Sequence, residues 1–220
     1  MIGVDCVDVD RLIRAAEIST ERLQFAEVRL LSSIRSNHPW VETIDPIGDI
    51  EAYNDFIVKR LHGHVRTTLA LVIQHDGFVL NPDAWRDDFR TWDYIGAPWS
   101  VEGERVVGNG GFSLRSRRLL ERLAAPDIVR PEGVPEDWFT CVLTRDVLEA
   151  EGFRFALPDI AHEFSFEGDA AFGVSWHGQF GFHGLKWTDI SAWLDVHSGA
   201  GIVNELDDES AALLRAQRDA

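Results

Sequence analysis

Four short segments of the sequence combine residue types that could do chemistry. The first, Gln74-His75-Asp76-Gly77, directly follows a run of β-prone apolar residues at 67–73. In an open parallel sheet, ligands bind at the carboxyl ends of the strands. A carboxylate followed by glycine at that place can reach a metal ion while the chain turns sharply. An ordinary turn at a strand end, with a solvated aspartate, is the alternative.

The second segment is rich in glycine. Residues 107–116 read VGNGGFSLRS, and three glycines within four residues allow a ligand to approach the backbone closely. We expect a helix to follow, whose first N–H groups attract an anion, with Arg115, Arg117 and Arg118 adding positive charge. A plain glycine turn before a helix is the alternative. The segment matches neither the P-loop nor the dinucleotide-binding motif.

The other two segments contain two acids and a histidine. Glu136 and Asp137 lie at an expected helix start, where they serve either as a general base or as ordinary helix capping groups. His183 lies in FGFHGLKW and could ligate a metal ion through a ring nitrogen, while Lys186, one of two lysines, could contact a phosphate. A half-buried histidine bonded to a loop carbonyl is the alternative for His183.

The first half of the chain shows alternating strand and helix patterns, which predict the framework that positions these segments. The apolar patterns predict strands over residues 2–7, 26–31, 41–44 and 67–73. They predict helices over residues 9–23 and 49–64, the second capped by Asp49. The nearly continuous run 67–73 is typical of a central strand that is buried on both faces. This alternation indicates an α/β fold with a mostly parallel central sheet flanked by helices.

The second half of the chain shows weaker patterns. We expect long loops over residues 74–88, 92–109 and 158–184, with helices at 115–123 and 135–151. No composition break indicates a domain boundary. We therefore expect one domain over residues 1–200, with a loop-rich C-terminal half that builds the site, and a helix or tail over residues 201–220.

Composition narrows the possible partners. The chain has 21 Lys plus Arg against 37 Asp plus Glu, a formal net charge of −16, which argues against binding to nucleic acid or to an anionic membrane surface. No apolar run approaches the roughly 18 residues of a membrane span, and no signal peptide is visible, so we expect a cytoplasmic protein. Two cysteines make neither a disulfide framework nor a four-cysteine zinc site. Eight tryptophans suggest stacking surfaces.

The order of the four segments is that of nucleotide-sugar glycosyltransferases with the GT-A fold. More closely, the chain resembles a bacterial and fungal family of glycosyltransferase-like proteins that was long catalogued as a domain of unknown function. The resemblance covers roughly residues 2–187 and implies a single GT-A-like, Rossmann-like domain. Its segments are YNDFIVKRL, LALVIQHDGFVLNPDAW, WDYIGAPW, VGNGGFSLRSRRLL, PEDWFTC and FGFHG.

The resemblance implies roles for residues on the donor side. Asp76 takes the last position of the D-x-D metal motif and His183 completes the metal site, while Gln74 takes the first position, where the full motif has an acid. A divalent cation, Mn²⁺ or Mg²⁺, would be the cofactor. The residues implied to bind a nucleoside diphosphate sugar are Val4, Asp5, Cys6, Gln74, Gly110, Gly111 and Lys186.

The resemblance also implies the acceptor side. Asp137, with Glu136 before it, matches the acid that deprotonates the acceptor hydroxyl in inverting members. One base on the attacking face predicts inversion at the anomeric carbon. We expect aromatic faces to stack on a glycan or glycoside acceptor. The acceptor-binding candidates are Trp92, Asp93, Tyr94, Trp99 and Trp138.

Two other functions remain open from the sequence. The carboxamide of Gln74 and the many tryptophans also fit a catalytically silent module that binds a carbohydrate or a nucleotide sugar. A metal-dependent hydrolase that uses Asp76, His183 and water is a third hypothesis, although the sequence offers few ligands for a two-metal site. The glycosyltransferase, with a UDP-sugar favoured as donor, is the leading prediction.

Overall fold

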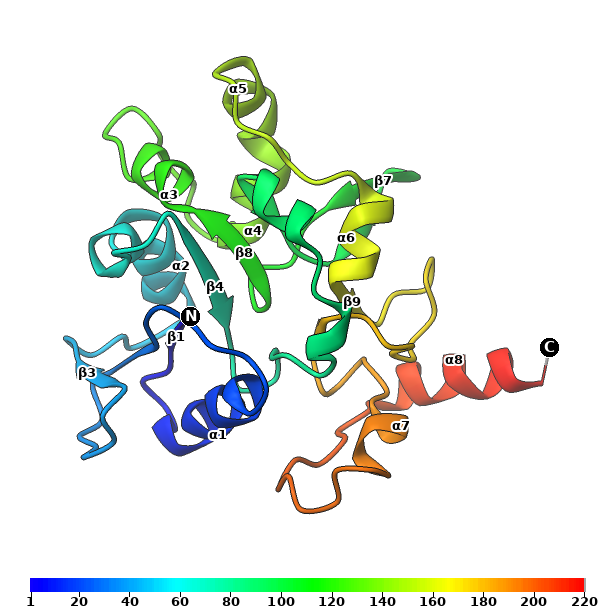
Figure 1. Ribbon diagram of the computed structural model, residues 1–220. Helices are drawn as coiled ribbons and strands as arrows, with labels where there is room; N and C mark the ends of the chain where they lie inside the picture. Colours follow the sequence, from blue (N-terminus) through cyan, green and yellow to red (C-terminus); the bar gives the residue numbers. More distant parts are fainter. Residues whose placement is uncertain (220) are drawn as a thin grey trace.

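A six-stranded sheet forms the centre of the computed structural model, which describes residues 1–219 (Figure 1). The strand order is β3-β2-β1-β4-β8-β5. Strands β1 to β4 are mutually parallel, β8 runs antiparallel to β4, and β5 runs antiparallel to β8. The expected α/β fold with a mostly parallel sheet is therefore confirmed. The bounds are β1 (Ile2–Val4), β2 (Arg29–Ser32), β3 (Val41–Thr43), β4 (Leu69–Ile73), β5 (Tyr94–Ile95) and β8 (Ser113–Ser116).

Helices cover both faces of this sheet, as the pattern of β4 requires. Leu71 and Ile73 pack into the larger apolar cluster, which includes the inner face of α1 (Val9–Thr20). Ala70 and Val72 point the other way, into a second cluster with side chains of α2 (Ile50–Lys59) and α3 (Arg117–Leu123). Alternate residues of a strand point to opposite faces, so an uninterrupted apolar run suits a strand that is covered on both.

Two aspartates fix where the first helices begin. Asp8 caps α1 by accepting hydrogen bonds from the backbone N–H groups of Asp10 and Arg11. Asp49 caps α2 through the N–H of Ala52 at 2.8 Å, as expected from the sequence. These helices follow β1 and β3, so their start points set the loops at the carboxyl edge of the sheet.

The second half of the chain contains more regular structure than we expected. Residues 92–109 hold β5 and a hairpin of β6 (Pro98–Val101) and β7 (Glu104–Val107). Residues 158–184 hold α6 (Pro158–Phe164) and the parallel pair β9 (Ser165–Glu167) and β10 (Gly181–His183). Our assignment of these ranges to loops was wrong. The remaining short helices are η1 (Leu61–His64), η2 (Pro82–Ala84), η3 (Asp87–Thr91), α4 (Glu136–Trp138), the π-helical η4 (Phe139–Leu143), α5 (Arg145–Ala150) and α7 (Ser191–Leu194).

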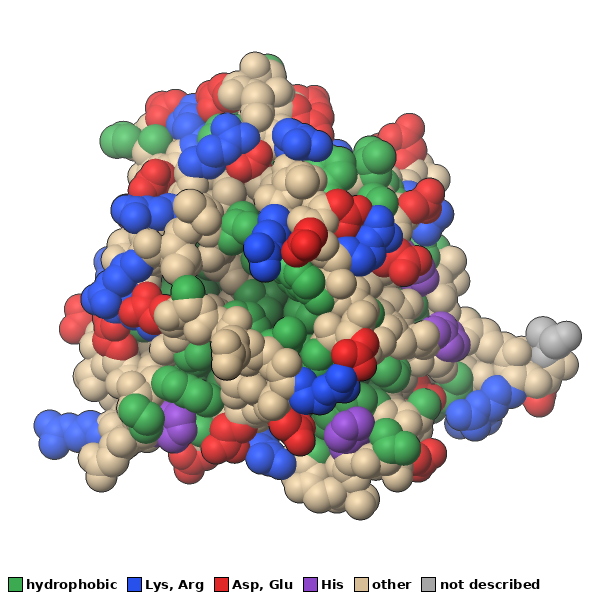
Figure 2. Space-filling view, viewed as in Figure 1, with side chains coloured by type: hydrophobic (Ala, Val, Ile, Leu, Met, Phe, Trp, Pro, Cys, Tyr) green, Lys and Arg blue, Asp and Glu red, His purple; other side chains and the backbone are tan. Residues whose placement is uncertain are grey.

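The end of the described chain is helical, as the sequence pattern indicates. Helix α8 (Asp208–Arg218) extends away from the rest of the molecule and buries only Ser210 (Figure 1). Across residues 1–219, no helix is both long enough and apolar enough to cross a membrane. Figure 2 shows acidic and basic side chains interspersed around a central hollow with hydrophobic walls.

Candidate functional site

The chemistry-bearing segments meet at one edge of the sheet. Strands β1 and β4 are parallel, with Ile2 opposite Val72, so both chains leave the sheet at the same edge. Because β8 is antiparallel to β4, with Val72 opposite Ser113, the glycine-rich loop that precedes β8 lies at this edge too. The fold thus brings the first two sequence segments together, as expected for an open α/β sheet.

A cavity of about 290 Å³ lies between the ends of β1 and β4 and the start of α2. It brings together four of the predicted donor residues, namely Val4, Asp5, Cys6 and Gln74. Asp5 organises the wall of this cavity, because its carboxylate accepts hydrogen bonds from the N–H groups of Val7 and Asp8 and from Nε of Arg11. The other lining residues are Val7, Arg11, Ile47, Gly48, Asp49, Ile50, Tyr53 and His75.

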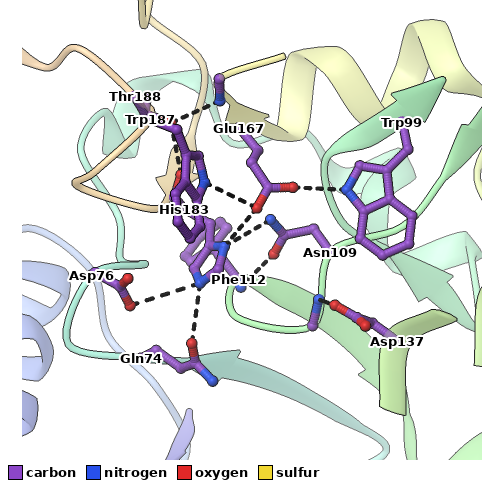
Figure 3. A network of polar contacts seen from close by, with 12 residues as sticks. Gln74, Asp76, Trp99, Asn109, Phe112, Asp137, Glu167, His183, Trp187 and Thr188 are labelled. Carbon is purple, nitrogen blue, oxygen red and sulfur yellow. Dashed lines mark hydrogen bonds and ion pairs between the residues drawn. The ribbon is translucent and has the colours of Figure 1, made fainter. Parts of the chain in front are cut away.

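Gln74, Asp76 and His183 converge beside this cavity (Figure 3). Nε2 of His183 lies 3.0 Å from Oε1 of Gln74 and 3.7 Å from Oδ1 of Asp76. The backbone brings His183 there, because the N–H of Gly184 donates to the carbonyl of Asp76 at 2.7 Å. Tyr53 fixes the orientation of Gln74, since Nε2 of the carboxamide donates to the Tyr53 hydroxyl at 2.6 Å, which turns Oε1 toward His183.

The ligand types of these three side chains, and one unsatisfied oxygen among them, suit a hard divalent cation. Oδ1 of Asp76 is buried and has no hydrogen-bond partner, which is costly unless something else satisfies it. Carboxylate and carboxamide oxygens with one imidazole nitrogen are ligands that Mn²⁺ accepts and, for the oxygens, that Mg²⁺ prefers. No group of three or more His, Cys, Asp or Glu side chains suited to a metal ion occurs within residues 1–219, so Gln74 would have to serve as a ligand.

Glu167 fixes the orientation of the His183 ring. Its Oε1 lies 3.0 Å from Nδ1 of His183, and a carboxylate can only accept, so Nδ1–H donates and Nε2 faces Gln74 and Asp76. Burial alone would lower the pKa of His183, but the hydrogen bond to Glu167 and the charges of Glu167 and Asp76 raise it to about 9. This carboxylate–histidine pair is the arrangement that orients histidine ligands in metal sites.

The glycine loop packs directly against this cluster. A Cβ on Gly111 would lie 2.1 Å from Nε2 of His183 and 2.8 Å from Oε1 of Gln74. Asn109 adopts a left-handed conformation, with φ of 64°, and its Oδ1 accepts from the N–H of Phe112 at 3.0 Å. The loop therefore turns through Asn109 and approaches His183 so closely that only glycine fits.

Asp137 contacts Gly110, which precedes Gly111 in the glycine loop. One carboxylate oxygen accepts from the N–H of Gly110 at 2.9 Å, and the other from the N–H of Trp138 at 2.8 Å. Burial raises the pKa of Asp137, and the charge of Glu136 adds to that, against the lowering effect of the two backbone donors. A carboxylate in such a site can act as a base.

Glu136 has a different environment from Asp137. It is buried, and both of its oxygens accept hydrogen bonds from the guanidinium of Arg115 at 2.7 and 2.8 Å. Arg115 is fully buried and also donates to the carbonyl of Gly110. We therefore remove Glu136 from the catalytic candidates, because its carboxylate holds the loop rather than facing a ligand.

The helix expected over residues 115–123 is present but begins two residues later, and the three arginines do not form an open cationic cluster. Residues 113–116 form β8, and α3 begins only at Arg117. Arg117 pairs with Glu121 on the helix surface, while Arg118 pairs with Asp93. Arg115 is bonded to Glu136, so all three guanidinium groups have protein partners. A bound anion would therefore have to be neutralised by other groups.

The acceptor-binding candidates separate into two groups. Trp99 and Trp138 stack with ring centroids 6.2 Å apart and an interplanar angle of 27°, and Trp138 is partly exposed beside Asp137. The structure does not place the other three at this surface. Tyr94 is fully buried with its hydroxyl bonded to the carbonyl of Asn109, Asp93 is buried with Arg118 and Ser116, and Trp92 packs against the core under Arg154.

Sequence reasoning missed Glu167, which is central to the site. Its carboxylate accepts from the indole N–H groups of Trp99 at 2.7 Å and Trp187 at 3.2 Å, in addition to Nδ1 of His183 (Figure 3). The segment 158–184 shows no strand-like periodicity, so nothing in it marked Glu167 as part of a strand that faces the site. Lys186 is exposed and follows β10 within three residues of His183.

Comparison with known proteins identifies a family. The model of a protein family described as a protein of unknown function, DUF5672, matches residues 41–183, which is more than half of the chain. This range runs from β3 to His183 and includes the glycine loop, Asp137 and Glu167. No curated protein matches the chain.

Proposed function

The chain belongs to the DUF5672 family, and we propose that it is a metal-dependent, inverting glycosyltransferase. It would move a sugar from a nucleoside diphosphate sugar, with a UDP-sugar favoured, to a hydroxyl of a glycan or glycoside acceptor. The observation that supports this most is the position of one loop, Gly110-Gly111. Gly111 touches His183 beside the cavity, and the N–H of Gly110 binds Asp137.

On the donor side, we assign the nucleoside to the cavity between β1, β4 and α2. The diphosphate would lie at the edge of this cavity beside Gln74, whose carboxamide contacts His183. A net charge of −16 repels such an anion, so binding needs a local positive group. The arginines of residues 115–118 are bonded to acids, which leaves a bound cation as the simplest source of that charge.

Asp76, His183 and Gln74 are the residues that would hold Mn²⁺ or Mg²⁺. The unsatisfied Oδ1 of Asp76 and the Nε2 of His183 point to the same place, and Glu167 keeps the ring in that orientation. When bound, the cation stabilises the negative charge that develops on the leaving diphosphate.

Asp137 is our candidate for the base. Its carboxylate would take the proton of the acceptor hydroxyl as that oxygen attacks the anomeric carbon and the bond to the diphosphate breaks. Two backbone donors hold the carboxylate in place without neutralising it. A single base on the attacking face gives inversion, and the stacked rings of Trp99 and Trp138 next to Asp137 offer an apolar surface for the acceptor sugar.

A silent sugar-nucleotide-binding module is the second candidate. It is favoured by one observation, the amide of Gln74 at a position where a second carboxylate would strengthen cation binding. The same cavity and loop would then bind a nucleotide sugar without turnover. The two functions therefore differ in turnover and not in binding.

A thermal-shift screen tests the donor assignment. Purified protein is heated with UDP-, GDP-, CMP- and dTDP-sugars, each with and without Mn²⁺. At a concentration 100-fold above Kd, a ligand of the native state adds about 2.7 kcal/mol, or roughly 5–10 °C for a chain of this size. We expect such a shift for at least one donor with Mn²⁺, reduced in Asp76→Asn but not in Asp83→Asn, an exposed aspartate paired with Arg22. No shift with any donor would contradict the proposal.

A further inference from the structure

Glu167 is a partly buried carboxylate with several donors and no arginine or lysine among the partners recorded in residues 1–219. Its Oε2 accepts from Nε1 of Trp99 at 2.7 Å. Its Oε1 accepts from Nδ1 of His183 at 3.0 Å and from Nε1 of Trp187 at 3.2 Å. Burial alone would raise the pKa of Glu167, but the hydrogen bond and charge of His183, together with hydrogen bonds from Trp99 and the amide of Asn109, hold it below its usual value.

The two oxygens of Glu167 face different sides of the site. Oε1 bonds the histidine whose other nitrogen faces Gln74 and Asp76. Oε2 bonds Trp99, whose ring stacks on Trp138 at the place assigned to the acceptor. One planar carboxylate therefore lies between the cation ligand and the aromatic platform, as Figure 3 shows.

Glu167 is held firmly to His183 within one pair of strands, whereas Trp99 reaches it from a separate hairpin. Glu167 and His183 are direct partners in the parallel pair β9 and β10, and Thr188 ties the two strands by bonding the N–H of Gly168 and the carbonyl of His183. Trp99 comes from the separate hairpin of β6 and β7, where its ring lies over Gly108. The bond to Glu167 is thus a contact between the hairpin and the strand pair.

We infer that Glu167 is a positioning residue that couples the cation site to the acceptor platform, by holding His183 and Trp99 with one carboxylate. This inference rests on the proposed function, which assigns the cation to the His183 side and the acceptor to the Trp99 side. Occupation of the His183 side by a cation would change the charge and position of the imidazole. Through Glu167, that change would reach the Trp99 indole and set the ring on which the acceptor stacks.

A carboxamide cannot replace this carboxylate. Glu167→Gln keeps the shape, but its NH₂ group must face either Trp99 or the pair of donors from His183 and Trp187. Two N–H donors then face each other where little water can separate them, which costs free energy. Trp99→Phe removes one of these donors, so the NH₂ group of the introduced carboxamide can turn to that side while its oxygen still accepts from His183.

The first test uses indole N–H signals in ¹⁵N NMR spectra at constant pH, with Mg²⁺ as probe. Trp99 is assigned by the loss of its signal in Trp99→Phe. We expect addition of Mg²⁺ to shift the Trp99 signal in the wild-type protein and to leave that signal unmoved in Glu167→Gln. Trp193, whose indole donates to the carbonyl of Leu80 in the core, serves as the internal reference for an intact fold.

The second test is a double-mutant cycle on Mg²⁺ affinity measured by calorimetry. We expect Glu167→Gln to weaken Mg²⁺ binding by about 10-fold or more, the effect usual for the partner of a histidine ligand. In the Trp99→Phe background, we expect the same change to cost clearly less, because the opposing donor is gone. Where transfer is measurable, Glu167→Gln also raises KM for the acceptor more than it lowers kcat.

The outcomes separate this inference from the proposed function. If Mg²⁺ binds the wild-type protein but the Trp99 signal does not respond, or if the two substitutions are additive, the coupling is disproved and the proposed function stands. If Mg²⁺ binds and the Trp99 signal responds through Glu167 but no donor is turned over, the coupling stands and the transferase does not. If the wild-type protein binds neither Mg²⁺ nor Mn²⁺ in calorimetry, the coupling and the metal-dependent transferase are both wrong.

Discussion

At the scale of single residues, two adjacent acids show how environment decides a role. Glu136 and Asp137 are indistinguishable in the sequence as capping groups or bases. In the structure, Glu136 is neutralised by two hydrogen bonds from the buried Arg115, whereas Asp137 has only backbone donors. Pairs of carboxylates in unequal surroundings commonly divide between a structural and a catalytic role. The sequence could not make this choice, because it offered no reason to bury Arg115.

The pH dependence of transfer follows from Asp137. Burial raises its pKa above the usual value for aspartate. A base works in its deprotonated form, so activity is present above the pKa of Asp137 and is lost as the pH falls through it. We predict that the acidic limb of kcat/KM lies above the ordinary aspartate range, and that it disappears, with a rate loss of about 10²–10⁴-fold, in Asp137→Asn. An unchanged limb in that variant would assign it to another group.

At the scale of elements, the first half of the chain was predictable and the second was not. The strands and helices up to Ile73 have apolar runs or helical spacing that a packed sheet requires, and Asp49 marked a helix start correctly. Strands β6, β7, β9 and β10 are three or four residues long, and tertiary contacts rather than periodicity determine them. The helix predicted for RSRRLLERL starts two residues too early, because Arg115 and Ser116 belong to β8 and pair with β4.

The pairing of β8 predicts that Arg115 is structurally essential while Arg117 is not. Removal of Arg115 leaves Glu136 buried without a partner, which costs about 3–5 kcal/mol. Arg117 pairs with Glu121 on the surface of α3, a contact typically worth about 0.3–0.5 kcal/mol. We predict that Arg115→Met lowers the free energy of unfolding in urea by about 3–5 kcal/mol, and Arg117→Met by about 0.5 kcal/mol. Equal effects would show that the buried pair is not needed.

The close approach of the glycine loop gives a second prediction for an element. A Cβ on Gly111 would overlap His183, whereas one on Gly63 would meet no atom within 4 Å. We predict that Gly111→Ala weakens Mn²⁺ binding at least about 10-fold, because the His183 ring must move, while Gly63→Ala leaves it unchanged. Calorimetry with Mn²⁺ measures both. Normal affinity in Gly111→Ala would place the cation away from His183.

At the scale of the whole molecule, the charge of −16 acts on every ligand. It argues against nucleic acid as a partner, and it also opposes a nucleoside diphosphate unless positive charge is supplied locally. Most arginines near the site are bonded to acids, so a chain of this composition has little free positive charge to offer there. The acidic chain repels the anionic donor unless a metal ion is bound, so we expect donor binding to depend on the metal.

Release of nucleoside diphosphate from a UDP-sugar is the most direct measurement of the central claim. The protein is incubated with UDP-sugars, an acceptor mixture of glycosides and Mn²⁺, and free UDP is measured over time. We predict UDP release by the wild-type protein, its loss when EDTA removes the cation, and a decrease of at least about 100-fold in Asp137→Asn. Donor binding without UDP release, or release that is insensitive to both EDTA and Asp137→Asn, would contradict the proposed transferase.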